Sequence, residues 1–291
     1  MTIEKSKSIM SFRLRISTPK GHNMFLEYLD KLRMYGKRHF TFQGIIQDLH
    51  ISENAAKAGL FRLKKANKII SPIKGLYVMV PPEHQPYGSI PAEELVPIIM
   101  KHLNVDYYVG LLSAGLFYGA THQKPARFQV ITNKRVKHPL KFGDIVIELS
   151  YKNSLEGLPT KDFVVSTGYL KVATPELLAI DLFKYSARAA GISHIATVLS
   201  ELAPSIDENK LIELAQALGE VAQIQRLGFI LEKIDVMEDE EKKQKIINRL
   251  LKYLKNLDRP FVSLVPYISR TGHPRCKKWK IIENTDFESD L

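Results

Sequence analysis

Residues 52–79 read SENAAKAGLFRLKKANKIISPIKGLYVM and decide the fold of the first third of the chain. Ser52 is a residue type that caps a helix N-terminus, and apolar residues follow it at helical spacing. The stretch predicts a helix over 53–67, with an inner face of Ala56, Leu60 and Leu63. Two short β-rich runs follow it, over 69–71 and 76–80, and Pro72 to Gly75 bend the chain between them.

Two further helices are predicted upstream of this stretch. Leucine and aromatic residues recur every three or four positions from Asn23, and Gly36 ends that helix. Thr41 can cap a short helix that runs to Leu49, and a tight turn at 50–51 connects it to the next. The predicted order is that of a winged helix-turn-helix: a helix, a short helix, a turn, a longer basic helix and a two-stranded ribbon.

The charge distribution points to a nucleic acid as the partner of this segment. Residues 1–80 hold fifteen Lys/Arg and five Asp/Glu, a net charge of +10, whereas the whole chain carries +11. A basic module joined to a nearly neutral remainder is typical of a nucleic-acid-binding domain fused to a second domain. A basic head that only keeps the protein in solution is the alternative.

The outward face of the 53–67 helix and its surroundings supply the candidate DNA contacts. Residues near the N-terminus of such a helix meet base edges, and flanking basic residues meet phosphates. Ser52, Asn54 and Lys57 are the candidates for base contact, because Asn pairs with adenine and Lys donates to guanine. Phe61 also lies on this face. The candidates for phosphate contact are Arg62, Lys64, Lys65 and Lys68. Lys74 is the candidate in the wing, and Thr41 is the candidate at the start of the second helix. Charge runs on helices are also often no more than a solvated face.

The rest of the chain reads as a larger α+β region. Pro81 to Gly88 forms a Pro-rich linker, a helix begins near Pro91, and Val105 to Gly119 resembles a tightly packed, buried helix. Four strand-like runs follow, at 128–132, 144–149, 163–166 and 169–172. A helix is then expected to begin at Pro175, with Thr174 as its cap. Further helices are expected at 192–202, 207–218, 221–234 and 238–257, and Ser205 and Glu208 form a capping box for the second of these.

The predicted fold class is α+β, and the domain plan follows from these segments. We expect a basic arm at 1–22, the winged helix-turn-helix at 23–82 and a C-terminal domain at 83–291. That domain is expected to be β-rich over about 83–173, helical over about 174–260 and polar over 261–291. A basic cluster around Trp279 precedes an acidic end in the last segment, and a solvated, frayed terminus is the expectation there. Contact with nucleic acid or a partner protein is its alternative.

Composition predicts a cytoplasmic protein. A single cysteine, Cys276, excludes an internal disulfide framework and fits a reducing compartment. No apolar run reaches the roughly 18–20 residues that span a bilayer, and Met1 to Ser11 lacks the apolar stretch of a signal peptide.

The motifs of common enzymes are missing from the sequence, so we expect no catalytic residues, cofactor or metal. No Gly-rich phosphate loop is present. His273 and Cys276 stand at a metal-like spacing without a second pair of ligands. Asp144 and Glu148 come nearest to a nuclease motif, but Ser150 stands where that motif needs a lysine.

Three segments together resemble the AbiEi-type antitoxins, the transcriptional-regulator half of a type IV toxin–antitoxin and phage-defence pair. They are Ile70 to Pro81, Tyr107 to Gly119 with His122–Gln123 and the 128–132 strand, and Val172 to Leu182. The resemblance covers roughly residues 24–190, and the order and spacing of the segments carry it.

The resemblance implies a DNA-binding autorepressor that is also an antitoxin. The winged helix would bind inverted repeats in its own promoter, and the C-terminal domain would oppose an AbiEii-like nucleotidyltransferase toxin. Two alternatives stay open. One is a single-function regulator whose C-terminal domain senses a ligand or oligomerises. The other is a divergent nuclease with a DNA-binding head.

Overall fold

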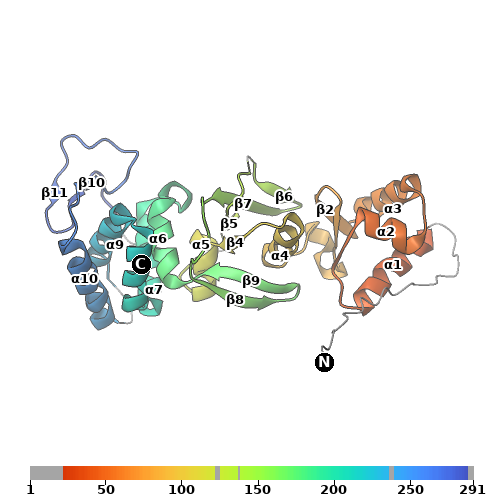
Figure 1. The fold of residues 1–291 in the computed structure, drawn as a ribbon. Coiled ribbons are helices and arrows are strands. Elements are labelled where there is room, and N and C mark those ends of the chain that lie inside the picture. Colours follow the sequence, from red (N-terminus) through yellow and green to blue (C-terminus); the bar gives the residue numbers. More distant parts are fainter. Residues whose placement is uncertain (1–21, 122–124, 137, 236–238, 288–291) are drawn as a thin grey trace, which may run out of the picture. The chain divides into compact units, whose positions relative to one another are not determined.

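The structure, a computed structural model, describes residues 22–121, 125–136, 138–235 and 239–287 (Figure 1). The chain divides into two compact units, one of residues 1–91 with 142–144 and one of residues 92–141 with 145–291. The expected basic arm lies outside the described residues, apart from His22, where the first helix begins.

The first unit has the predicted order of elements. Its helices pack against a three-stranded antiparallel sheet of order β1-β3-β2. Its elements are α1 (His22–Met34), β1 (His39–Thr41), α2 (Phe42–Leu49), α3 (Glu53–Lys65), β2 (Ile69–Ile73), β3 (Leu76–Met79) and the 3-10 helix η1 (Pro82–Tyr87). Three helices with a β-ribbon after the third are the arrangement of a winged helix-turn-helix. The Pro-rich stretch predicted as a linker contains η1.

One apolar core joins the helices of the first unit to its sheet. Phe25 and Leu29 of α1 are buried with Ile45 of α2 and Leu63 of α3. Gly59 allows α3 to approach α1 closely, because a Cβ atom there would lie 2.1 Å from Cζ of Phe25. The face of α3 that carries Gly59 and Leu63 is buried in this core, so the opposite face of α3 is free to meet a partner.

The second unit contains a mixed six-stranded sheet of order β6-β7-β5-β4-β9-β8. β5 pairs antiparallel with β4 and parallel with β7, and all five of its residues are buried. The strands are β4 (Tyr107–Val109), β5 (Phe128–Thr132), β6 (Leu140–Phe142), β7 (Ile145–Tyr151), β8 (Thr160–Val165) and β9 (Gly168–Ala173). The helical elements among them are α4 (Ala92–Leu103), α5 (Leu111–Gly115) and η2 (Leu116–Tyr118).

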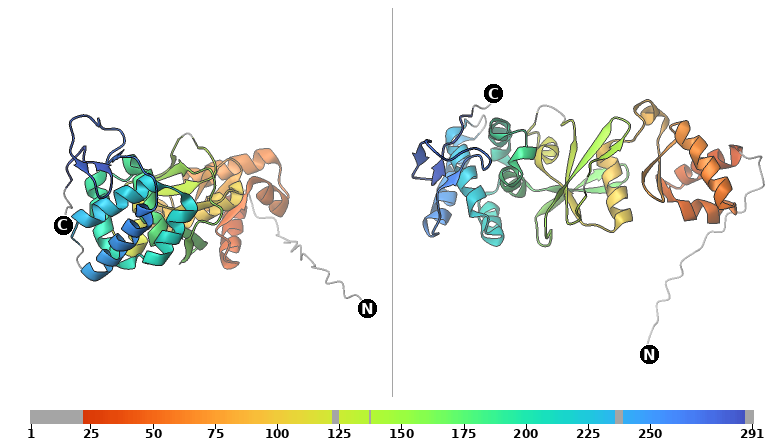
Figure 2. Two further views of the ribbon diagram at one scale, coloured as in Figure 1. Left: turned by 60° about the vertical axis from the view of Figure 1, so that its left-hand side comes forward. Right: turned by 90° about the horizontal axis from the view of Figure 1, so that it is seen from above.

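Helices follow the sheet, as predicted, and pack against one another around α6 and α9 (Figure 2). They are α6 (Pro175–Lys184), η3 (Ser186–Arg188), α7 (Ile192–Leu202), η4 (Ala203–Ser205), α8 (Glu208–Leu218), α9 (Val221–Lys233) and α10 (Glu240–Lys255). Eight of the ten residues of α6 are buried, so this helix lies at the centre of the helical region. The predicted fold class, with its mixed middle and helical C-terminal regions, is confirmed.

Three local predictions were wrong. Val105 to Gly119 is not one helix, because β4 pairs with β5 and β9 before the short α5 begins. Ser205 lies in a 3-10 turn, and Asp207 caps α8 by accepting from the backbone N–H groups of Asn209 and Lys210. Thr174 stands at the N-cap of α6, but its side chain makes no capping hydrogen bond.

The expectation of a frayed C-terminal tail was also wrong. Short strands β10 (Val262–Ser263), β11 (Arg275–Cys276) and β12 (Ile281–Ile282) form a three-stranded sheet. Trp279 is fully buried, and its indole N–H donates to Oε2 of Glu232 at 2.7 Å. Gly228 of α9 leaves room for the indole, because a Cβ atom there would lie 2.0 Å from Cζ3 of Trp279. The tail is therefore docked on α9 at Trp279, and Phe287 also contacts Phe229 of that helix, with ring centroids 6.3 Å apart.

Candidate nucleic-acid interface

Helix α3 presents two distinct faces. Ala56, Gly59, Leu60 and Leu63 are buried, whereas Asn54, Lys57, Phe61, Arg62, Lys64 and Lys65 are exposed. With about 100° of rotation per residue, Asn54, Phe61 and Lys65 lie opposite the buried face. Lys57 and Lys64 flank this central line on one side and Arg62 on the other. The predicted basic surface is thus a continuous face of one helix.

The hydroxyls of Thr41 and Ser52 both cap helices. Oγ1 of Thr41 accepts from the backbone N–H of Gly44 at 3.0 Å, and Oγ of Ser52 accepts from that of Ala55 at 3.2 Å. A hydroxyl that accepts one hydrogen bond can still donate its own proton. Both residues are exposed, so each can cap its helix and donate to a phosphate or a base.

Lys57 and Asn54 lie in the first turns of α3, where base contact was predicted. Nζ of Lys57 is 3.3 Å from Oε2 of Glu53, and the two side chains are 62% and 63% exposed. Exposed i,i+4 ion pairs contribute only about 0.3–0.5 kcal/mol, so Lys57 can exchange Glu53 for a nucleic acid at little cost. The Asn54 side chain is exposed beside it.

The candidates for phosphate contact lie further along the unit. Arg62, Lys64 and Lys65 occupy the last turn of α3, and Lys68 follows it with a half-buried side chain. Lys74 is exposed in the turn between β2 and β3, where Gly75 adopts a φ of 84°. A positive φ favours glycine, and here it closes the wing tip that carries Lys74. The structure therefore places all nine predicted residues on or beside α2, α3 and the wing.

Two features of the charged surface escaped sequence reasoning. Phe61 was noted on the outward face, but no role was assigned to it. The net charge of +1 over residues 81–291 also hides a strong asymmetry, because residues 242–280 hold twelve Lys/Arg and one acidic residue. Sequence reasoning found the cluster around Trp279, which is the tail part of this segment. A count in shorter windows would also have found the part on α10.

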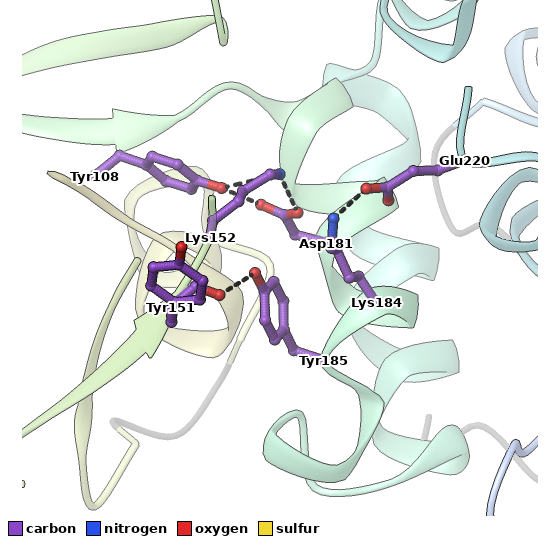
Figure 3. A network of polar contacts seen from close by, with 7 residues as sticks. All are labelled: Tyr108, Tyr151, Lys152, Asp181, Lys184, Tyr185 and Glu220. Carbon is purple, nitrogen blue, oxygen red and sulfur yellow. Dashed lines mark hydrogen bonds and ion pairs between the residues drawn. The ribbon is translucent and has the colours of Figure 1, made fainter. Parts of the chain in front are cut away.

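A buried polar network ties the sheet of the second unit to its helical region (Figure 3). Nζ of Lys152, just after β7, lies 2.9 Å from Oδ1 of Asp181 on α6. The Tyr108 hydroxyl, from β4, donates to Oδ2 of Asp181 at 2.6 Å. Tyr185 donates to the backbone oxygen of Tyr151 at 3.0 Å. The network joins β4, β7 and α6, elements far apart in the sequence.

Burial dominates the electrostatics of this network. Both members of the ion pair are almost inaccessible, with side-chain exposures of 6% for Lys152 and 0% for Asp181. Burial raises the pKa of Asp181, although Lys152 and the Tyr108 hydroxyl oppose that shift. Burial, with the charge of Asp181, also raises the pKa of Tyr108 well above its usual range. These groups are satisfied by one another, which indicates a structural role.

The second unit also contains an open cleft of about 750 Å³ between the β8–β9 hairpin, the start of α6 and α8. Its charged lining residues are Lys161, Lys210, Glu176, Asp207 and Glu213. Among the described residues, no group of three or more His, Cys, Asp or Glu side chains could hold a metal ion. No helix in the described part of the chain is long and apolar enough to cross a membrane.

Fold and surface together define the class of protein: a winged helix with a basic third helix, joined to an α+β unit. Residues 108–233 of that second unit match the family model of the AbiEi antitoxin C-terminal domain. This segment is therefore similar to the C-terminal domain of AbiEi antitoxins, and the predicted resemblance is confirmed over these residues.

A solved structure shares the fold over nearly its whole length. The crystal structure of RV2827C protein from Mycobacterium tuberculosis is similar with a TM-score of 0.63 and 15% sequence identity. The similarity covers 92% of this chain and 95% of that chain. No protein with a curated description matches the sequence.

Proposed function

We propose that the protein is a DNA-binding autorepressor and the antitoxin of a type IV toxin–antitoxin pair. The observation that supports it best is the joining, in one chain, of an exposed basic α3 to an AbiEi antitoxin domain. The winged helix would bind inverted repeats in the promoter of its own operon. The second unit would counteract an AbiEii-like nucleotidyltransferase toxin encoded beside it.

The dimensions and chemistry of α3 suit the major groove. Its 13 residues make a rod about 20 Å long, which the groove of B-DNA can admit. Asn54 would pair with an adenine edge and Lys57 would donate to guanine. Arg62, Lys64 and Lys65 would neutralise phosphates beside the groove, and Lys74 would do so from the wing.

Promoter and toxicity assays in cells test the two halves of this proposal separately. A reporter fused to the protein's own promoter measures repression, and growth during co-expression of the neighbouring toxin measures protection. We expect the double variant Lys57→Ala/Lys64→Ala to lose repression and retain protection, because both substitutions lie in the first unit. Full repression by that variant would refute the assignment of α3, and failure of the wild type to protect would refute the antitoxin role.

The cleft in the second unit favours one alternative, a single-function regulator that senses a small ligand. The lining carries Lys161 and Lys210 together with Glu176, Asp207 and Glu213, so a ligand there would need polar groups that suit both charges. The neighbouring gene discriminates between the two proposals. A nucleotidyltransferase with paired aspartates supports the antitoxin, and a neighbour of another kind supports the regulator.

A further inference from the structure

Phe61 is the large apolar side chain on the exposed face of α3. Its exposed fraction is 68%, and it lies opposite the buried face of the helix. Asn54 stands seven residues before it, which is two turns or about 10 Å along the helix axis. The two side chains therefore share one line on the surface.

The fold of the first unit does not need a phenylalanine at this position. The core takes Leu60 and Leu63 from α3, and Phe61 is absent from it. At an exposed position in a helix, Phe is a poorer helix former than Ala or Lys. Isolated apolar residues on a surface are common, so exposure alone decides nothing. The position of Phe61 is what suggests a binding role, because Lys57, Lys64 and Lys65 surround the ring on the face proposed to meet DNA.

We propose that Phe61 reads thymine, with its ring against the C5 methyl group in the major groove. This inference rests on the proposed DNA binding. The thymine methyl is the apolar group that base pairs present in that groove, and Phe is among the side chains that contact it. Ala58, one turn before Phe61, is exposed and small, so it lets a base edge approach the ring. The neighbouring ammonium groups, bound to phosphates, would hold the helix in place.

The competing use of an exposed ring is contact with a protein, such as a second copy of the chain. The cationic surroundings argue against it, because two copies of this face would bring like charges together. A protein contact would also be indifferent to the methyl groups of the DNA. That difference makes the two uses separable by experiment.

The test is a binding cycle with the full-length protein and two duplexes of its own upstream sequence, one with thymine and one with uracil throughout. The wild type should bind the uracil duplex about fourfold more weakly for each methyl buried. Phe61→Ala should bind the thymine duplex more weakly by the same factor and should no longer distinguish the duplexes. Met34→Ala is the matched control, since Met34 of α1 is 86% exposed and lies off α3. It should behave as the wild type does.

Each result has one meaning. If Phe61→Ala still distinguishes thymine from uracil as the wild type does, the thymine contact is refuted while DNA binding stands. If the wild type binds the thymine and uracil duplexes equally well, the thymine contact is likewise refuted while DNA binding stands. If the wild type binds neither duplex better than a shuffled sequence, the proposed function itself fails. Phe61→Leu, which keeps an apolar side chain, should retain part of the discrimination.

Discussion

At the scale of single residues, α3 separates side chains that hold the helix from side chains that are free to bind. Oγ of Ser52 is engaged with the backbone N–H of Ala55, whereas the amide of Asn54 is exposed. From the sequence, both residues were candidates for base contact, and Ser52 was also predicted to cap the helix. The structure confirms the cap, so Ser52 contributes to helix stability as well.

Asn54→Ala and Ser52→Ala should therefore differ. We expect Asn54→Ala to weaken operator binding by about 1–3 kcal/mol and to leave the free energy of unfolding unchanged. Ser52→Ala should lower the free energy of unfolding of the first unit by about 0.5–2 kcal/mol. Urea titrations and operator-binding titrations of both variants measure this. Equal unfolding of the wild type and Ser52→Ala would contradict the capping role.

Lys64→Ala should differ from both of these variants, because Lys64 is expected to contact phosphate rather than a base or the helix backbone. Its loss should weaken binding to the operator and to unrelated DNA by similar factors. It should also reduce the dependence of log affinity on log salt concentration by about one counterion. Selective loss of operator binding alone would instead assign Lys64 to a base.

The buried pair Lys152–Asp181 makes the largest stability prediction. Removal of one partner leaves an uncompensated charge, which costs about 3–5 kcal/mol. Lys152→Met should lower the free energy of unfolding of the second unit by this amount. The double variant Lys152→Met/Asp181→Leu removes both charges and should recover much of the loss. A cost below about 1 kcal/mol for Lys152→Met would show that the pair does not carry stability.

At the scale of elements, the docked tail is the main structure that local sequence could not predict. The stretch around Trp279 is strongly basic and contains few apolar residues. Its burial depends on Gly228, about fifty residues earlier in α9, which leaves the space for the indole. The strand β4 was missed for a similar reason, because its partners β5 and β9 are distant in sequence. Long, strongly periodic helices such as α1 and α7 were predicted to within a few residues.

Gly228→Ala tests the docking of the tail. The added methyl group would overlap the indole ring, so Trp279 must move or the helix must shift. Overpacking of this kind costs typically about 1–3 kcal/mol. Trp279 is the single tryptophan of the chain, so its fluorescence reports the event directly. We expect a red-shifted emission for Gly228→Ala and an unchanged spectrum for the control Gln223→Ala on the same helix.

The ion pair beneath the tail predicts its pH dependence. Burial raises the pKa of Glu232, but hydrogen bonds from Lys278 and from the indole of Trp279 outweigh it, so the net pKa is lowered. A carboxylate with a depressed folded-state pKa stabilises the fold above its unfolded pKa, and this contribution is lost as the pH falls through the folded value. We therefore expect the tail to weaken in acid, below the ordinary range of glutamate.

Trp279 emission during an acid titration measures this effect. Glu232→Gln removes the titrating group, so its stability should vary less with pH below about 4.3, the ordinary pKa of glutamate. An identical acid dependence in the wild type and in Glu232→Gln would assign the effect to other carboxylates.

At the scale of the whole molecule, basic charge occurs in two places. The first unit holds the winged helix, and residues 242–280 form a second basic segment with a net charge of +11. Exposed lysines on any surface bind DNA without regard to sequence. The binding of the intact protein to arbitrary DNA is therefore no evidence for an operator, and only the difference between operator and control sequence tests α3.

The sequence predicted the architecture better than it predicted the functional surface. Helical periodicity and turn residues were enough for the winged helix and for the order of β-rich and helical regions. The interface was predicted through charge, so the lysines and arginines were named as candidates and Phe61 was given no role. An aromatic residue has no charge to mark it, and its place opposite the buried face follows only once that face is known.

The central claim is that α3 recognises a specific DNA sequence upstream of the gene. The most direct measurement is a gel-shift titration of the purified protein on that DNA and on a shuffled control, at about 50 and 200 mM salt. We expect tight binding to the upstream DNA, weaker binding to the control and a steep fall of both with salt. Equal binding to the two sequences at both salt concentrations would contradict it.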